Sequence, residues 1–140
     1  MHLQHVSRYL LLLLCVMALM GCAHHKLSLE DIIEMPSENI VKVGLDIPNH
    51  KGEIHTSNKR TDIDELLDYL SSFQYEKIRG DVTTHMDMSA PMIYIYGKHT
   101  ESFLVPYDDE VMIDQHLYRV KDDQIDYETL QYYYEKIADE

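Results

Sequence analysis

The alternation of apolar and polar residues along the chain predicts six β-strands. The clearest case is the segment 40–47, in which valine, leucine and isoleucine occupy every second position from Val41 to Ile47. This period of two is typical of a strand with one buried face. The turn-forming residues from Pro48 to Gly52 indicate that this strand returns as a hairpin. The other predicted strands are Glu53–Ser57, Met92–Tyr96, Ser102–Tyr107, Val111–Asp114 and Leu117–Val120.

The spacing of apolar residues also predicts two amphipathic helices. The first is capped by Thr61 or Asp62 and the second by Asp126, and each then carries apolar side chains three and four residues apart. These side chains are Ile63, Leu66, Leu67, Leu70 and Phe73 in the first helix, and Tyr127, Leu130, Tyr133 or Tyr134, and Ile137 in the second. One additional helical turn is expected around Leu29–Met35, before Pro36 stops it.

The order of these elements predicts an α+β domain. Two strands, a helix, four strands and a helix, or ββαββββα, favour an antiparallel sheet of five to six strands with both helices packed on one face. Residues 40–140 are expected to form this single domain, and the sequence contains no internal repeat.

The first 22 residues resemble the leader of a bacterial lipoprotein. The apolar run from Tyr9 to Met20 has the length of a signal-peptide core and falls short of the ~20 residues that a membrane-spanning helix needs. It ends in Leu19-Met20-Gly21-Cys22, which is similar to the lipobox at which signal peptidase cleaves before a lipid-bearing cysteine. Met20 departs from the small residue usual at its position.

This interpretation assigns residues 1–21 to a signal peptide and 22–39 to the lipidated Cys22 and a tether. Acyl chains such as palmitate together with diacylglyceryl on Cys22 would hold the protein on the outer face of the cell membrane, since two or more chains anchor stably. The alternatives are an ordinary secretory signal or a retained anchor. All three place the rest of the chain outside the cytoplasm. The other cysteine, Cys15, lies within the predicted signal peptide.

The chain is strongly acidic. It has 12 Lys and Arg against 25 Asp and Glu, and residues 22–140 retain all of these except Arg8. A surface with this charge repels nucleic acid, whose phosphates need basic contacts, so nucleic acid is excluded as a partner. Cations or a basic protein partner remain open.

Several segments together resemble the small lipoproteins of Bacillus-type bacteria that are known only as domains of unknown function. They are the lipobox, the short tether, the opening hairpin, the stretch TDIDELLDYLSS at 61–72, and the tyrosine-rich strands MIYIYG, FLVPYD and HLYRV. The resemblance covers most of residues 22–140. It implies an anchored extracytoplasmic domain, and it implies no activity and no functional residue.

The densest candidate for chemistry is the segment 85–92. Its imidazole and thioether groups, from His85, Met86, Met88 and Met92, are soft ligands that suit Cu(I). The alternative is that Met92 begins a buried strand while the other methionines pack beneath a loop.

The sequence contains no nucleophile motif and no phosphate-binding glycine loop. We therefore expect a non-enzymatic lipoprotein that serves as a binding or interaction module for a protein of the cell envelope, without a cofactor. Copper binding through the segment 85–92 is the alternative.

Overall fold

The computed structural model describes residues 26–48, 52–78 and 89–138. They form one antiparallel sheet of eight strands in the order β1-β4-β8-β7-β6-β5-β2-β3. The strands are β1 Lys26–Leu27, β2 Ile40–Asp46, β3 Ile54–Ser57, β4 Tyr75–Lys77, β5 Met92–Gly97, β6 Glu101–Tyr107, β7 Glu110–Ile113 and β8 His116–Val120. The helices are α2 Leu29–Ile33, the short 3₁₀ helix η2 Ser37–Asn39, α3 Arg60–Ser71 and α4 Tyr127–Ala138. The α+β class and the antiparallel sheet agree with the sequence prediction.

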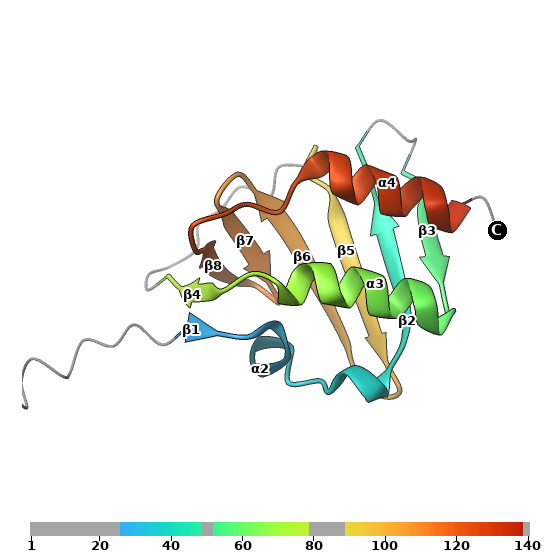
Figure 1. Ribbon diagram of the computed structural model, residues 1–140, viewed down its shortest axis with the longest axis horizontal. Coiled ribbons are helices and arrows are strands. Elements are labelled where there is room, and N and C mark those ends of the chain that lie inside the picture. Colours follow the sequence, from blue (N-terminus) through green and yellow to red (C-terminus); the bar gives the residue numbers. More distant parts are fainter. Residues whose placement is uncertain (1–25, 49–51, 79–88, 139–140) are drawn as a thin grey trace, which may run out of the picture.

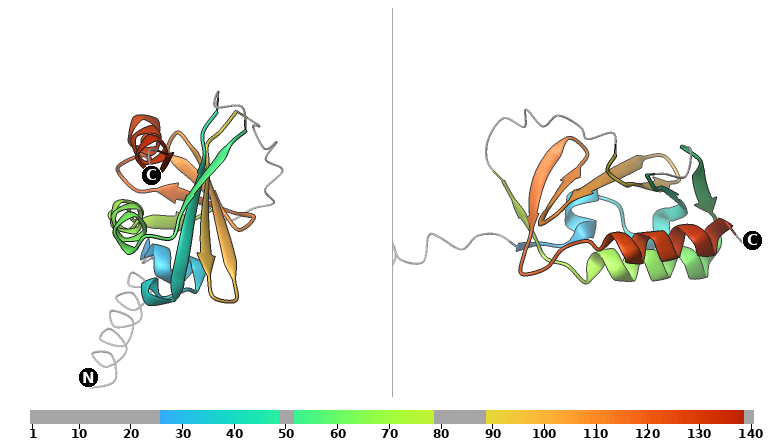
Figure 2. Two further views of the ribbon diagram at one scale, coloured as in Figure 1. Left: turned by 90° about the vertical axis from the view of Figure 1, so that its right-hand side faces the viewer. Right: turned by 90° about the horizontal axis from the view of Figure 1, so that it is seen from above.

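The helices lie side by side on one face of the sheet, with α3 between α2 and α4 (Figures 1 and 2). The core forms between this face and the helices. Its largest fully buried side chains include Leu45, Ile95 and Leu104 from the sheet and Leu66 and Tyr134 from the helices. Alternate residues of the central strands belong to this core, such as Val43 and Leu45 of β2 and Ile93 and Ile95 of β5, as expected for an antiparallel sheet covered on one face.

The sheet has eight strands, so the prediction of five to six was wrong. All six predicted strands are present, and the additional ones are β1 and β4. These have two and three residues and are too short to display an alternation. They form because their backbones pair in a row: Leu27 lies opposite Tyr75, which in turn lies opposite Val120 of β8.

Most of the predicted tether belongs to the folded unit. Residues 26–39 form β1, α2 and η2, and Leu29 and Met35 are buried in the core. The helical turn expected around Leu29–Met35 is confirmed as α2. Its N-terminus is closed by a capping box between Ser28 and Asp31, and Glu34 ends it in the left-handed conformation with φ 51°. Residues 26–39, expected in the tether, therefore pack with the residues of the predicted domain.

Two local details differ from the sequence expectation. Val41 was expected on the buried face of β2, but it is 42 % exposed because the pairing register shifts between Ile40 and Lys42. Helix α3 has its N-cap at Lys59, two residues before Thr61, the first of the two predicted caps, and the Lys59 side chain makes no capping hydrogen bond. The cap predicted for α4 is confirmed, since the Asp126 carboxylate accepts a hydrogen bond from the Thr129 amide at 2.9 Å.

Candidate functional site: the groove between α2 and α3

Helix α3 has three different neighbours. Ile63, Leu66 and Leu70 are buried against the sheet. A second stripe, represented by Glu65 and Tyr69, contacts α4. The third stripe faces α2 and consists of Asp64, Leu67, Asp68 and Ser71, which recur at the three- and four-residue spacing of one helix face.

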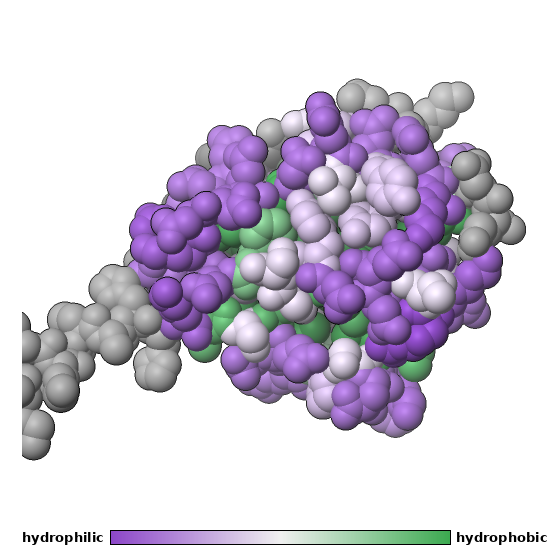
Figure 3. Space-filling model, viewed as in Figure 1, coloured by the Kyte–Doolittle hydropathy of each residue, from purple (hydrophilic) through white to green (hydrophobic). Residues whose placement is uncertain are grey.

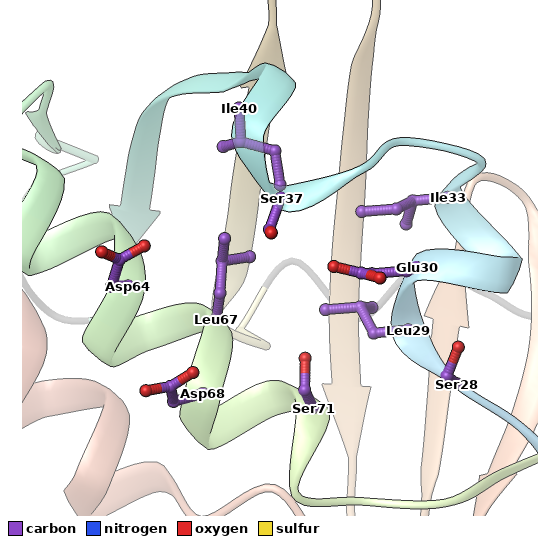
Figure 4. Close-up of a pocket in the computed structure, with 10 residues that line it drawn as sticks. All are labelled: Ser28, Leu29, Glu30, Ile33, Ser37, Ile40, Asp64, Leu67, Asp68 and Ser71. Atoms are coloured by element: carbon purple, nitrogen blue, oxygen red, sulfur yellow. The ribbon is translucent and has the colours of Figure 1, made fainter.

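A groove of about 330 Å³ lies between this third stripe and α2. Its apolar lining comes from both sides, and its polar groups are carboxylates and serine hydroxyls. In Figure 4, Glu30 extends from α2 across the groove toward Leu67, and the hydroxyls of Ser37 and Ser71 point into it. The lining residues are Ser28, Leu29, Glu30, Ile33, Ser37, Ile40, Asp64, Leu67, Asp68 and Ser71. We call this feature the α2–α3 groove.

The walls of the α2–α3 groove are held by local hydrogen bonds. The guanidinium of Arg60 donates to the carbonyl oxygens of Ser37 at 3.1 Å and Ile40 at 3.3 Å, and it forms an ion pair with Asp64. This arrangement ties η2 to the first turn of α3. At the other wall, the capping box lowers the pKa of Asp31 through hydrogen bonds from Ser28. The groove is therefore preorganised before any ligand binds.

The groove is lined by negative charge. The segment 29–39 carries four carboxylates and no basic residue, and α3 carries four more against Arg60. Glu30 and Asp68 form no ion pair within the part of the chain that the structure describes. The helix-bearing face as a whole is largely hydrophilic, with apolar atoms visible between the helices (Figure 3).

The opposite side of α3 is closed. The ring of Tyr69 packs edge-on against Phe73 with centroids 5.2 Å apart, and it contacts Tyr133 of α4 at 5.9 Å. Lys136 of α4 donates to the Glu65 carboxylate at 2.6 Å, and this bond raises the pKa of Lys136. We call this contact the α3–α4 seam.

A buried polar cluster stands at the start of α3. The Ser57 hydroxyl donates to Asp62 at 2.6 Å and accepts from the Lys59 amide at 3.1 Å. Asp62 is 5 % exposed, and Lys136 lies 3.9 Å from its other oxygen. Because the Ser57 proton is directed to a carboxylate and no histidine joins the cluster within the described ranges, we assign it a role in fixing α3.

His55 also has a structural environment. Its ring stacks on Tyr134 with centroids 3.8 Å apart, and its Nδ1 lies 3.1 Å from the Tyr134 carbonyl oxygen. The Tyr134 hydroxyl donates to the Glu53 carbonyl at 3.0 Å, so the stacked pair joins α4 to β3 and the residue before it.

The predicted site residues fall mostly outside the part of the chain that the structure describes. This holds for Cys22, His85, Met86 and Met88. Met92 is the first residue of β5, as expected, and its sulfur accepts a weak hydrogen bond from the Tyr94 hydroxyl at 3.5 Å. Within residues 26–48, 52–78 and 89–138, no three His, Cys, Asp or Glu side chains are placed to hold a metal ion.

The α2–α3 groove was not predicted from the sequence. The acidic residues around it were visible only as part of the general charge, and Leu67 was assigned to the core. The signal that could have indicated it is the difference between the two flanks of α3. One flank carries Tyr69 and Phe73, whereas the other carries aspartates and a serine.

Comparisons with known proteins add no family to these observations: no family model, curated protein or solved structure shows a significant match to this chain. Among the described residues, no helix has both the length and the apolar character required to cross a membrane.

Proposed function

We propose that this chain is an extracytoplasmic lipoprotein, anchored to the cell membrane through Cys22, that acts as a non-enzymatic binding module for an envelope protein. The observation that carries the binding role is the α2–α3 groove, a preorganised concave surface with an apolar lining and two carboxylates, Glu30 and Asp68, that form no ion pair among the described residues. The leader, with its lipobox-like Gly21-Cys22, supports the anchor.

The anchor and the groove are close in the sequence. Three residues separate Cys22 from β1, and α2 follows β1 after Ser28. A fully extended chain spans at most about 3.6 Å per residue, so the lipid would lie within roughly 14 Å of β1. The proposal therefore places the groove near the membrane surface, where a membrane-associated partner is concentrated.

The anchor is tested by Cys22→Ala in the full-length chain. We expect the variant to leave the membrane fraction and to lose the mass of the lipid. The matched control is Cys15→Ala, which removes the other thiol from the predicted signal peptide and should leave membrane retention unchanged. A processed Cys22→Ala chain that stays on the membrane contradicts the anchor.

The binding role is tested by site-specific cross-linking. A lipidated Cys22 leaves the mature chain without a free thiol, so Ser71→Cys introduces a unique attachment point in the groove for a photoreactive maleimide. The control is Tyr132→Cys on α4, where the side chain is 60 % exposed. We expect a discrete protein adduct in intact membranes from residue 71 and none from residue 132. Equal labelling from both positions, or none from either, contradicts a binding role for the groove.

A further inference from the structure

At the α3–α4 seam, carboxylates of α3 are paired with a basic side chain of α4. On that side, Lys136 lies over the stripe, with its Nζ 2.6 Å from Glu65 and 3.9 Å from Asp62. A single lysine side chain thus lies near two carboxylates. The α2 side has the same kind of stripe, in which Asp68 and the facing Glu30 form no ion pair among the described residues.

The dimensions of the α2–α3 groove suit one long side chain. Its volume of about 330 Å³ is at the lower end of ligand sites. Leu29, Ile33 and Leu67 offer apolar contact for an unbranched stem, and Glu30 offers an anionic partner for its end. The hydroxyls of Ser37 and Ser71 point into the groove and can accept additional hydrogen bonds from a cationic group (Figure 4).

We propose that the α2–α3 groove binds a lysine or arginine side chain presented by a basic segment of a partner protein. This inference rests on the proposed binding function and specifies the chemistry of its partner. The complementarity is electrostatic and steric: the protein is strongly acidic, the groove is lined by carboxylates, and one of them, Asp64, already pairs with an arginine side chain of this chain, Arg60. An acidic or purely apolar partner would remove water from the carboxylates of Glu30 and Asp68 without supplying a positive charge in its place.

The test uses the processed, lipidated chain in phosphatidylcholine nanodiscs, whose headgroups carry no net charge. The probe is a fluorescent peptide with the sequence Gly-Leu-Lys-Leu-Gly, blocked at both ends. The comparison peptide contains norleucine in place of lysine, which keeps the stem and removes the ammonium group. We expect the lysine peptide to bind at least about tenfold more tightly than the norleucine peptide, with affinity falling as salt is added.

A pair of double variants locates the binding. Glu30→Gln with Asp68→Asn removes two charges from the groove and should weaken the lysine peptide by about tenfold. Glu128→Gln with Glu135→Gln removes two exposed charges from α4 and should change its affinity by less than about twofold. Ser71→Leu, which fills the groove without changing charge, should also weaken binding by about tenfold.

Three outcomes overturn the inference. The first is that both double variants weaken binding of the lysine peptide equally, which indicates general charge attraction. The second is that the norleucine peptide binds as tightly as the lysine peptide. The third is that spermidine at the same concentration displaces the lysine peptide, which indicates a small polyamine ligand. If an adduct forms at residue 71 but the lysine peptide does not bind, the proposed function stands and only this assignment of the partner falls.

Discussion

The two flanks of α3 contact their neighbouring helices in different ways. On the α4 flank, Tyr69 and Tyr133 fill the space between the helices and Lys136 neutralises Glu65. On the α2 flank, serines and carboxylates line a groove that stays open. Both flanks lie on one helix that is buried against one sheet, so the difference comes from side-chain size and charge and not from the fold class.

Under the proposed function, the α4 flank serves stability and the α2 flank serves binding within a single helix. Aromatic rings and a buried hydrogen-bonded carboxylate stabilise a contact because they remove apolar area from water and satisfy polar atoms. Small polar side chains on the other flank contribute little to stability, and they leave room and charge for a partner. Variants on the two flanks should therefore differ in their effect on the free energy of unfolding.

The largest expected effect is at the α3–α4 seam. Tyr69→Ala should lower the free energy of unfolding by about 2–4 kcal/mol, because it removes two ring contacts and the hydrogen bond from the Asp126 amide to the Tyr69 hydroxyl. Ser71→Ala, on the groove flank of the same helix, should change it by less than about 0.5 kcal/mol. Urea denaturation measures both. Similar losses in the two variants would show that the groove is part of the stabilising core.

The next effect concerns the two kinds of carboxylate on α3. Asp62→Ala should cost about 1–3 kcal/mol, because it leaves the buried Ser57 hydroxyl without its acceptor. Asp68→Ala should lie within about 0.5 kcal/mol of the wild type, since Asp68 is exposed on the groove flank. Thermal unfolding at neutral pH tests the pair, and a larger loss for Asp68 than for Asp62 would contradict the comparison.

A smaller effect, of opposite sign, is expected when the groove is filled. Ser71→Leu places apolar atoms against Leu29 and Leu67 and should raise the free energy of unfolding by up to about 1 kcal/mol. The control is Tyr132→Leu, on an exposed part of α4, which should have no such effect. A stabilised variant that also loses the lysine peptide would show that the groove sacrifices stability for binding. Destabilisation by Ser71→Leu would indicate a groove already closely packed.

The smallest effect is local and depends on pH. Hydrogen bonds from Ser28 lower the pKa of Asp31, and those from Thr129 lower the pKa of Asp126, in both cases below the ordinary value near 3.8. Their contributions to folding are thus complete at neutral pH and are lost as the pH falls through the lowered values. We expect amide exchange protection in the first turns of α2 and α4 to fall on acidification before that of α3, whose N-cap residue, Lys59, supplies no capping carboxylate.

The control for this pH effect is a pair of variants, Asp31→Asn and Asp126→Asn, in which the titrating groups are absent. In these, the protection of the same turns should be lower at neutral pH and should change less on acidification. Earlier loss of protection in α3 than in α2 would contradict the assignment of the caps.

Much of the fold was predictable because its signals are local. The alternation from Val43 to Ile47 and the stripe from Ile63 to Leu70 reflect burial against one surface, and period alone identifies them. The strands β1 and β4 were missed because two or three residues carry no period. The bulge that exposes Val41 was missed because a shift in register depends on the partner strand.

The candidate site was less predictable for a related reason. Leu67 belongs to the apolar stripe of α3 and also lines the groove, and its sequence position cannot distinguish these roles. Glu30 and Asp68 are 38 positions apart in the chain. Their carboxylates line the same groove only when α2 packs beside α3.

The sequence by itself determined the six longer strands and the helices α2, α3 and α4, the acidic charge, and the lipoprotein-like leader on which the proposed anchor rests, because each is a property of contiguous residues. Tertiary structure alone decided that residues 26–39 belong to the domain, that eight strands share one sheet, and that one flank of α3 is closed while the other is open. The physical reason is that pairing of short strands and packing between helices depend on residues far apart in the chain, whose contacts form only when the whole core assembles.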